Sequence, residues 1–324
     1  MTESYHRPVM LSETIEALNV RPEGTYVDVT FGGGGHSRAI LERLGPEGRL
    51  IAFDQDEDAR QNAIDDSRFT LIGENFRYLK NYLRLYGVRR VDGVLADLGV
   101  SSHQFDTAER GFSTRFEGEL DLRMDRRGET TARDLVNDLD EEELARLLRL
   151  YGELPNARQM AKAIVRYRQG VQGVQGVQGV QGEGGIRTTT DLKEAVKHHL
   201  PRGMENKYLA MLFQALRIEV NGELEALKEM LMQAVELLPV GGRVAVISYH
   251  SLEDRLVKNF FRSGNFEGEV KKDFYGNPLS PVKPVGRWQA SEAEVAENSR
   301  ARSAWLRVGE RVMVKGYGLQ GRGY

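Results

Sequence analysis

The stretch VDVTFGGGGHS, Val27 to Ser37, decides how the first part of the chain is interpreted. An apolar run ends in four consecutive glycines, and a helical pattern follows over 37–45. Glycines between a strand and a helix let a ligand reach the backbone, and the helix N-terminus adds donor N–H groups. The stretch therefore predicts a ligand-binding turn between a strand over 25–31 and a helix.

Strand and helix patterns alternate on both sides of a long middle segment. Further strands are expected over 49–54, 69–73, 91–99, 241–249 and 304–314. Helices are expected from Asp56, near 76–86, in the apolar-periodic run YLAMLFQALRIEV and over 251–261. This alternation is typical of an α/β fold with a mostly parallel sheet and helices on both faces.

Residues 106–205 contain no convincing strand, but they do contain helical patterns over 138–152 and 156–168. We therefore expect one α/β domain formed by 1–105 and 206–324, interrupted by an inserted helical domain over 106–205. Within the insertion, the QGV repeat over 169–182 is rich in glycine and lacks aromatic residues. Such a tract predicts a flexible spacer without chemistry of its own.

Composition narrows the possible chemistry. The chain lacks cysteine, so no thiolate nucleophile or Cys zinc ligand is available, and its six histidines show no metal-ligand spacing. For this reason we expect no bound metal. No apolar run is long enough for a membrane span and no signal-peptide core is visible, so we expect a cytoplasmic protein. The net charge is −3, yet 271–324 carries ten Lys/Arg against five Asp/Glu. A basic face toward phosphate and a solvated surface both fit this asymmetry.

The glycine run does not match the dinucleotide fingerprint GxGxxG, because its third glycine would fall on Ser37 or Arg38. Asp54, about twenty residues further on, ends the second strand and could accept hydrogen bonds from ribose hydroxyls. Asp97 ends the fourth strand at the same edge of the sheet. Taken alone, each aspartate could be a helix cap. Together with the glycines they favour a nucleoside ligand, and S-adenosylmethionine fits better than NAD.

Eight motifs along nearly the whole chain are similar to one family. They are HRPVML, DVTFGGGGHSRAIL, LADLGVSS, ERGFS, LDLRMD, FQALRIEVNGEL, ISYHSLEDR and NSRARSAWLR. The sequence resembles the bacterial 16S ribosomal RNA cytosine-N4 methyltransferases. The resemblance implies a class I S-adenosylmethionine-dependent fold, Rossmann-like, with an inserted helical domain. It also implies action on the exocyclic N4 of a cytidine in the decoding region.

The resemblance carries the family's cofactor contacts onto seven positions of this chain. They are Gly34, Gly35, His36, Asp54, Phe76, Asp97 and Gln104. The sequence departs from the family pattern at the QGV repeat, at His103 where many relatives have proline, and in MENKYLAML before FQALR. The last two departures would alter RNA contacts and leave the chemistry intact.

Methylation of N4 suits a chain without cysteine, because an exocyclic amine needs no covalent intermediate. It needs in-line placement beside the methyl donor and an acceptor that draws the amine lone pair out of ring conjugation. Our hypothesis is that Asp97, or a neighbouring backbone carbonyl, is this acceptor.

Four residues are candidates for RNA contact: His250, Arg255, Arg300 and Arg302. Arg307 lies in the same basic segment, with Trp288 and Trp305 nearby. Arginines contact phosphate and aromatic rings stack on unpaired bases. A structural role for His250, a solvated face for Arg255 and core positions for both tryptophans are the alternatives.

Other functions remain compatible with the same motifs. They are a small-molecule methyltransferase with the helical insertion as a lid, a non-catalytic ribosome-assembly binder and, more remotely, an NAD oxidoreductase. The expected partner is 16S rRNA, and we favour the assembled small subunit over naked RNA. A homodimer is compatible with an apolar helix face in the insertion.

Overall fold

The structure, a computed structural model, describes residues 8–170 and 185–314. Nearly all of the QGV repeat expected to be flexible therefore lies outside the described residues. The chain forms two compact units. One consists of Met1–Gly99 and Leu224–Tyr324, and the other of Val100–Glu223.

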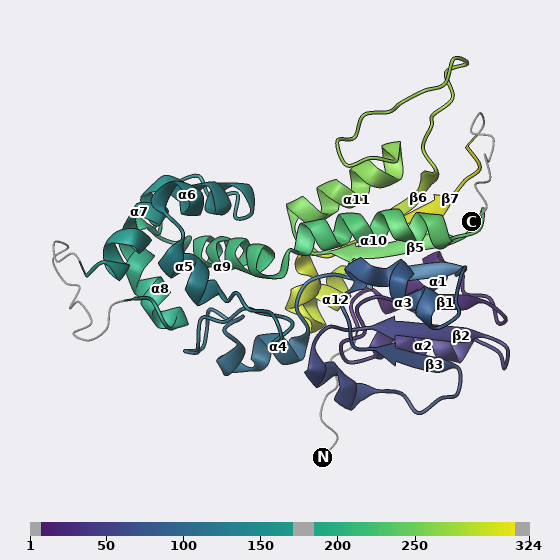
Figure 1. Cartoon of the computed structure of the whole chain (residues 1–324), viewed down its shortest axis with the longest axis horizontal. Helices are drawn as coiled ribbons and strands as arrows, with labels where there is room; N and C mark the ends of the chain where they lie inside the picture. Colours follow the sequence, from purple (N-terminus) through teal and green to yellow (C-terminus); the bar gives the residue numbers. More distant parts are fainter. Residues whose placement is uncertain (1–7, 171–184, 315–324) are drawn as a thin grey trace. The chain divides into compact units, whose positions relative to one another are not determined.

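The first unit contains a seven-stranded sheet with the order β3-β2-β1-β4-β5-β7-β6 (Figure 1). Its strands are β1 Thr25–Asp28, β2 Arg49–Phe53, β3 Phe69–Ile72, β4 Gly93–Asp97, β5 Arg243–Ser248, β6 Val282–Gln289 and β7 Trp305–Arg311. The first five strands are parallel, and β7 runs antiparallel between β5 and β6. A register shift interrupts the β6–β7 pairing between Pro284 and Gly286.

Helices cover both faces of this sheet because successive strand residues point to opposite sides. Val27 belongs to the core under α3, α10 and α11, whereas its neighbour Tyr26 belongs to the core under α1 and α2. The α-helices of the unit are α1 Leu11–Leu18, α2 Gly35–Arg43, α3 Leu79–Leu85, α10 Glu223–Leu237, α11 Ser251–Ser263 and α12 Glu292–Glu297. Its 3₁₀ helices are η1 Glu57–Asn62, η2 Phe76–Tyr78 and η5 Ser299–Ser303.

The strand order fixes where a ligand can lie. From β1 the chain adds β2 and β3 on one side and β4 and β5 on the other, so the order reverses between β1 and β4. Open α/β sheets bind ligands outside the carboxyl ends of the strands at such a reversal. Asp28 pairs in register with Leu95, and Asp97 pairs with Ile247, so the strand ends meet at one edge.

The second unit is helical. Its elements are α4 Ser102–Asp106, η3 Ala108–Arg110, α5 Ala132–Asp138, α6 Glu141–Leu150, α7 Ala157–Arg168, α8 Thr189–Val196, η4 Lys197–His199 and α9 Glu205–Asn221. Helices α4, α5, α6 and α8 each begin with a capping box. In a capping box the N-cap side chain accepts from the backbone N–H of the third helical residue, and the side chain of that residue accepts from the N-cap N–H. Asp140 caps α6.

The structure places the unit boundaries elsewhere than the expected 105/106 and 205/206. The divisions fall at 99/100 and 223/224, so the whole of α9 belongs to the helical unit. The reason is that Leu212, Phe213 and Leu216 of α9 are buried in the helical core. Two local expectations also differ. The helix expected from Asp56 is a 3₁₀ helix, and β6 was not expected at all.

In the part of the chain that the structure describes, no helix has the length and apolar character needed to cross a membrane.

Candidate functional site

The glycine turn connects β1 to α2 and is partly filled by the protein itself. Gly32 and Gly34 have positive φ angles of 51° and 75°, which favour glycine over residues with a Cβ. A Cβ on Gly35 would lie 2.1 Å from Cγ of Pro8, so this position is bare because the N-terminal segment packs on it. Gly33 is exposed and is therefore the glycine that a ligand can approach.

Asp54 follows β2 and supports this turn. Its Oδ2 accepts a hydrogen bond from the Gly32 N–H at 2.7 Å, and its Oδ1 accepts from the Asp56 N–H at 2.9 Å. Each carboxylate oxygen retains a second lone pair. The carboxylate can therefore hold the glycine turn and still accept hydrogen bonds from a ligand hydroxyl.

A buried polar chain joins the ends of β1 and β4. Asp28 is 1% exposed and accepts hydrogen bonds from the Ser37 hydroxyl at 2.7 Å and from the Thr30 N–H at 3.1 Å. The Thr30 hydroxyl oxygen accepts from the backbone N–H of Asp97 at 2.6 Å. These bonds fix the backbone that carries the Asp97 side chain.

The Asp97 side chain lies between residues from two other elements. Its Oδ1 accepts a 2.7 Å hydrogen bond from the Tyr249 hydroxyl, which follows β5. Its Oδ2 lies 3.7 Å from Nδ1 of His36 on α2. Although surrounded in this way, the side chain is 23% exposed, so a ligand in the crevice could reach it.

His36 is held by the N-terminal segment. Its Nε2 lies 3.1 Å from the Val9 carbonyl oxygen. Because a carbonyl only accepts, we assign the ring proton to Nε2, which leaves the Nδ1 lone pair facing Asp97. Burial lowers the pKa of His36, against the opposing effect of Asp28, and so favours this neutral ring.

The three aspartates at this edge all have raised pKa values. Burial raises the pKa of Asp97 to about 7, with Glu253 acting in the same direction and the Tyr249 hydrogen bond opposing it. Burial likewise raises the pKa of Asp54 to about 6 and that of Asp28 in the same direction. A cation placed among these carboxylates would stabilise their ionised forms.

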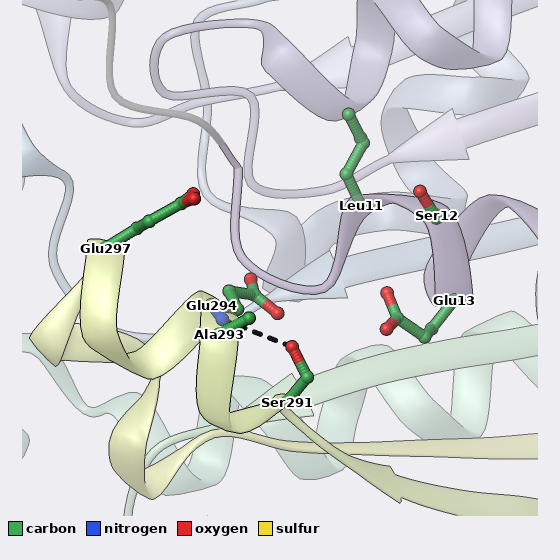
Figure 2. Close-up of a pocket in the computed structure, with 7 residues that line it drawn as sticks. All are labelled: Leu11, Ser12, Glu13, Ser291, Ala293, Glu294 and Glu297. Carbon is green, nitrogen blue, oxygen red and sulfur yellow. Dashed lines mark hydrogen bonds between the residues drawn. The ribbon is translucent and has the colours of Figure 1, made fainter.

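A small pocket of about 140 Å³ lies between α1 and α12, as Figure 2 shows. Three of its lining residues are glutamates: Glu13, Glu294 and Glu297. Glu294 also accepts a hydrogen bond from the Met10 N–H at 2.6 Å, which ties α12 to the N-terminal segment. Three carboxylates disfavour phosphate, and none of the residues expected to bind cofactor lines this pocket.

The remaining cofactor candidates lie in different surroundings. Phe76 begins η2 after β3, half-buried against the sheet core. Gln104 is buried in the helical unit, where its side-chain oxygen accepts from the Ser101 N–H at 3.0 Å as part of a capping box. The sequence expectation had placed Gln104 in the α/β domain, and α4 instead belongs to the helical unit.

The four RNA candidates differ in their structural role and in their exposure. His250 is the N-cap of α11, where its Nδ1 accepts from the Glu253 N–H at 3.5 Å. Its Nε2 lies 3.1 Å from Glu253 Oε1, but without hydrogen-bond alignment. A structural role thus accounts for this histidine. Arg255 and Arg302 are exposed, and Arg300 is half-buried in η5.

Arg307 does not suit the RNA contact considered for it. Its guanidinium forms two hydrogen bonds with the Asp254 carboxylate, at 2.6 and 3.0 Å, and the side chain is 14% exposed. Trp305 is covered by the Arg287 guanidinium, 3.2 Å from the ring centroid. Trp288 is 36% exposed on β6, so neither tryptophan is fully buried.

Sequence reasoning missed three groups that shape the Asp97 site. Tyr249 and Thr30 contact Asp97 directly, and Glu253 accepts from the Tyr249 N–H at 3.0 Å. Tyr249 could have been found, because it follows β5, which pairs in parallel with β4 and ends at the same edge. The expected lack of a metal stays a prediction.

Comparisons with known proteins give the family of the chain. The chain is 53% identical over 312 residues to "Ribosomal RNA small subunit methyltransferase H" of Flavobacterium johnsoniae, covering 96% of this chain and 99% of that protein. It is 53% identical to the protein of the same name from Bacteroides thetaiotaomicron, covering 95% of this chain and 98% of that one.

Among solved structures, an rRNA methylase from Streptococcus thermophilus aligns over 95% of this chain and 98% of its own at 12% identity. Its TM-score of 0.41 is too low to support an argument. The family match is decisive, since it spans residues 3–312 of this chain. The glycine turn, the aspartates at the strand ends and this match give one conclusion: the chain belongs to the MraW methylase family.

Proposed function

We propose that this methyltransferase transfers a methyl group from S-adenosylmethionine to the exocyclic N4 of a cytidine in the decoding region of 16S rRNA. The observation that carries the proposal is the Asp97 carboxylate, which lies partly exposed at the reversal of the strand order. The sheet and the family together give the class I, Rossmann-like methyltransferase fold expected from the sequence.

The residues at the crevice suit S-adenosylmethionine. The ligand supplies a methyl group on a positively charged sulfur, and Asp97 and Asp54 supply negative charge whose cost of burial that sulfonium would reduce. Asp54 has lone pairs for ribose hydroxyls, and Phe76 could flank the adenine. Gly33 is exposed beside them, with its carbonyl oxygen accepting a hydrogen bond from the Arg38 guanidinium at 2.6 Å. The contacts of Gly34, Gly35, His36 and Gln104 remain part of the proposal.

Asp97 can perform two tasks in the transfer. As a carboxylate it accepts a hydrogen bond from the amine, which draws the nitrogen lone pair away from the ring. After transfer the nitrogen carries an extra proton, and a carboxylate with a pKa of about 7 can accept it. Tyr249 and Thr30 hold Asp97 in place during both tasks.

The substrate is best represented by the assembled small subunit in the cytoplasm. Relatives named as methyltransferases of small-subunit ribosomal RNA support 16S rRNA as the substrate, and the choice of the assembled subunit over naked RNA stays a prediction. Arg300 and Arg302, next to the N-terminal part of β7, would contact RNA phosphate, and Arg255 would extend that surface along α11. His250 would position α11 in addition to any RNA contact. Pairing of two chains stays a prediction.

The test uses small subunits from cells that lack this protein. The enzyme is added with isotopically labelled S-adenosylmethionine, the RNA is digested, and the product nucleoside is identified by mass spectrometry. We expect labelled N4-methylcytidine with the native enzyme and almost none with Asp97→Asn. Absence of label in subunits and in naked RNA, despite measured cofactor binding, would contradict the proposal.

A further inference from the structure

The connection between α11 and β6 presents two aromatic side chains to solvent. Phe274 is 98% exposed and Tyr275 is 86% exposed, and their rings lie 5.6 Å apart at an interplanar angle of 87°. Figure 1 shows this connection extending beyond the end of α11. Large aromatic residues gain most of their stabilisation from burial, so a pair left this bare suggests a binding surface.

The turn that carries them is built by side-chain hydrogen bonds. The Asp273 carboxylate accepts from the Tyr275 N–H at 2.9 Å, from the Asn277 N–H at 2.8 Å and from the Asn277 side-chain amide at 2.9 Å. Gly276 adopts φ 85°, and a β-bridge joins Lys272 to Pro278 below the turn. The rings are therefore presented on an ordered turn, which reduces the conformational entropy lost on binding.

Two lysines beside the rings can pair with phosphate, although the stretch 267–277 also carries three acidic residues. Lys271 and Lys272 precede them and are exposed, and neither forms an ion pair among the residues that the structure describes. The adjacent Asp273 carboxylate is engaged within the turn, although Glu267 and Glu269 are also exposed nearer to α11. Aromatic rings beside lysines match unpaired nucleotides, which offer base faces for stacking and phosphates for ion pairing.

The topology separates this turn from the proposed active site. Val282, the first residue of β6, pairs with Arg311, and the preceding residue of β7, Glu310, pairs with Arg243 at the start of β5. Asp97 is level with Ile247, four residues further along β5. The connection between α11 and β6 therefore lies at the edge of the sheet opposite the crevice. The four residues of β5 between these two levels alone span about 13 Å. A partner that engages both edges must be extended.

We infer that the turn Lys271–Asn277 is a second RNA contact, in which Phe274 and Tyr275 stack on unpaired bases of rRNA away from the methylated cytidine and the two lysines pair with phosphates. The inference rests on the proposed function, since it takes the small subunit as the substrate. It adds a recognition surface that selects a large RNA particle over an isolated nucleoside or a small molecule.

The kinetic test compares Phe274→Ala/Tyr275→Ala with the native enzyme on small subunits. We expect KM for subunits to rise about tenfold or more, because stacking of a base on an aromatic side chain is a large part of single-strand binding. Cofactor affinity and Tm should not change, since both rings are exposed. Leu85→Ala is the matched control, because Leu85 is a 76% exposed apolar residue of the same unit. Lys271→Ala/Lys272→Ala should reduce the salt dependence of KM. An unchanged KM for the aromatic double variant would overturn the inference.

A crosslinking test separates RNA from protein partners. A photoreactive benzoylphenylalanine replaces Phe274, the full-length protein is irradiated with small subunits, and the crosslinked component is identified. A crosslink to rRNA supports the inference, whereas crosslinks only to ribosomal proteins overturn it. Because crosslinking needs binding and no turnover, a protein that crosslinks to rRNA but transfers no methyl group would contradict the proposed function alone.

Discussion

The α/β unit and the helical unit each contain a partly buried aspartate, and the neighbours of these two side chains shift their pKa values in opposite directions. Asp97 is 23% exposed and lies beside a tyrosine and a histidine, and burial raises its pKa to about 7. Asp121 of the helical unit is 15% exposed and forms hydrogen bonds with the Arg123 guanidinium at 2.7 and 2.8 Å. Burial acts to raise the pKa of Asp121, but the Arg123 bonds outweigh it and the pKa is lowered.

Under the proposed function, this difference separates an aspartate that stabilises the fold from aspartates that serve a ligand. Asp121 has its cation within the fold, so its charge contributes to stability. No arginine or lysine offsets the burial that raises the pKa of Asp97, Asp54 and Asp28, although His36 acts to lower the pKa of Asp28, and a positively charged ligand would reduce the cost of this burial. Buried carboxylates without a cation are therefore the better signal for a functional site in this chain.

Substitution of Asp97 should produce the largest effect. Asp97→Asn keeps the shape, since the amide oxygen can accept from Tyr249 and the amide N–H can donate to His36. We expect turnover on small subunits to fall about 10²- to 10³-fold, the scale seen when one group that stabilises a transition state is removed. Tm should be equal or higher at pH 8, because the variant buries no charge there. Full turnover with normal cofactor binding would remove Asp97 from the mechanism.

The corresponding change at Asp121 should affect stability and spare the chemistry. Asp121→Asn loses charged hydrogen bonds and leaves the Arg123 guanidinium without its carboxylate, which should lower the free energy of unfolding by about 1.5–3 kcal/mol. Urea unfolding of the full-length protein measures this loss. Turnover per folded molecule should remain near the native value, and unaltered unfolding would show that the ion pair contributes little.

Asp54 is the second aspartate at which the proposed contact with the cofactor can be tested. Asp54→Ala removes a charged acceptor for ribose hydroxyls and a support of the glycine turn, so cofactor binding should weaken by about 1–3 kcal/mol. Calorimetric titration with S-adenosylmethionine measures the change. Glu57→Ala, an exposed acidic residue of η1, is the control and should bind normally. Unchanged affinity in Asp54→Ala would exclude this residue from the site.

The smallest expected effect is a dependence of cofactor affinity on pH. The raised pKa values mean that part of the Asp54 and Asp97 population is protonated below pH about 6 and about 7. A sulfonium favours the ionised forms, so binding should release protons and affinity should increase as pH rises through this range, then level off. Calorimetry in buffers of different ionisation enthalpy measures the released protons. Asp97→Asn should lose the upper part of the dependence, and tighter binding at low pH would contradict this assignment.

The parallel strands and the fold class could be predicted because each β-branched run is followed by a helical pattern. The aspartates Asp54 and Asp97 followed from the same reasoning, as residues at strand ends. The strand β6 could not be predicted in this way. Its residues are largely exposed and include Pro284 and Gly286, so it lacks the alternation that marks a half-buried strand.

The neighbours of Asp97 were harder to predict, because they come from distant parts of the chain. Tyr249 is 152 residues away in sequence, and its contact depends on β5 pairing with β4 after the intervening helical unit. His36 contacts the Val9 carbonyl, and Pro8 packs against the neighbouring Gly35, so its surroundings also come from a distant segment. The unit boundary was misplaced for a related reason, since the apolar periodicity of α9 does not reveal which core buries it.

The hydrogen bond between Met10 and Glu294 spans 284 residues, almost the length of the chain, and it has a consequence during protein synthesis. The helical unit is one continuous segment and can fold soon after it emerges from the ribosome. The wall around His36 and Asp97 must wait for β5 and α12, because closing contacts this distant cannot precede the residues that make them. A nascent chain released before residue 294 would therefore contain a folded helical unit without a completed crevice.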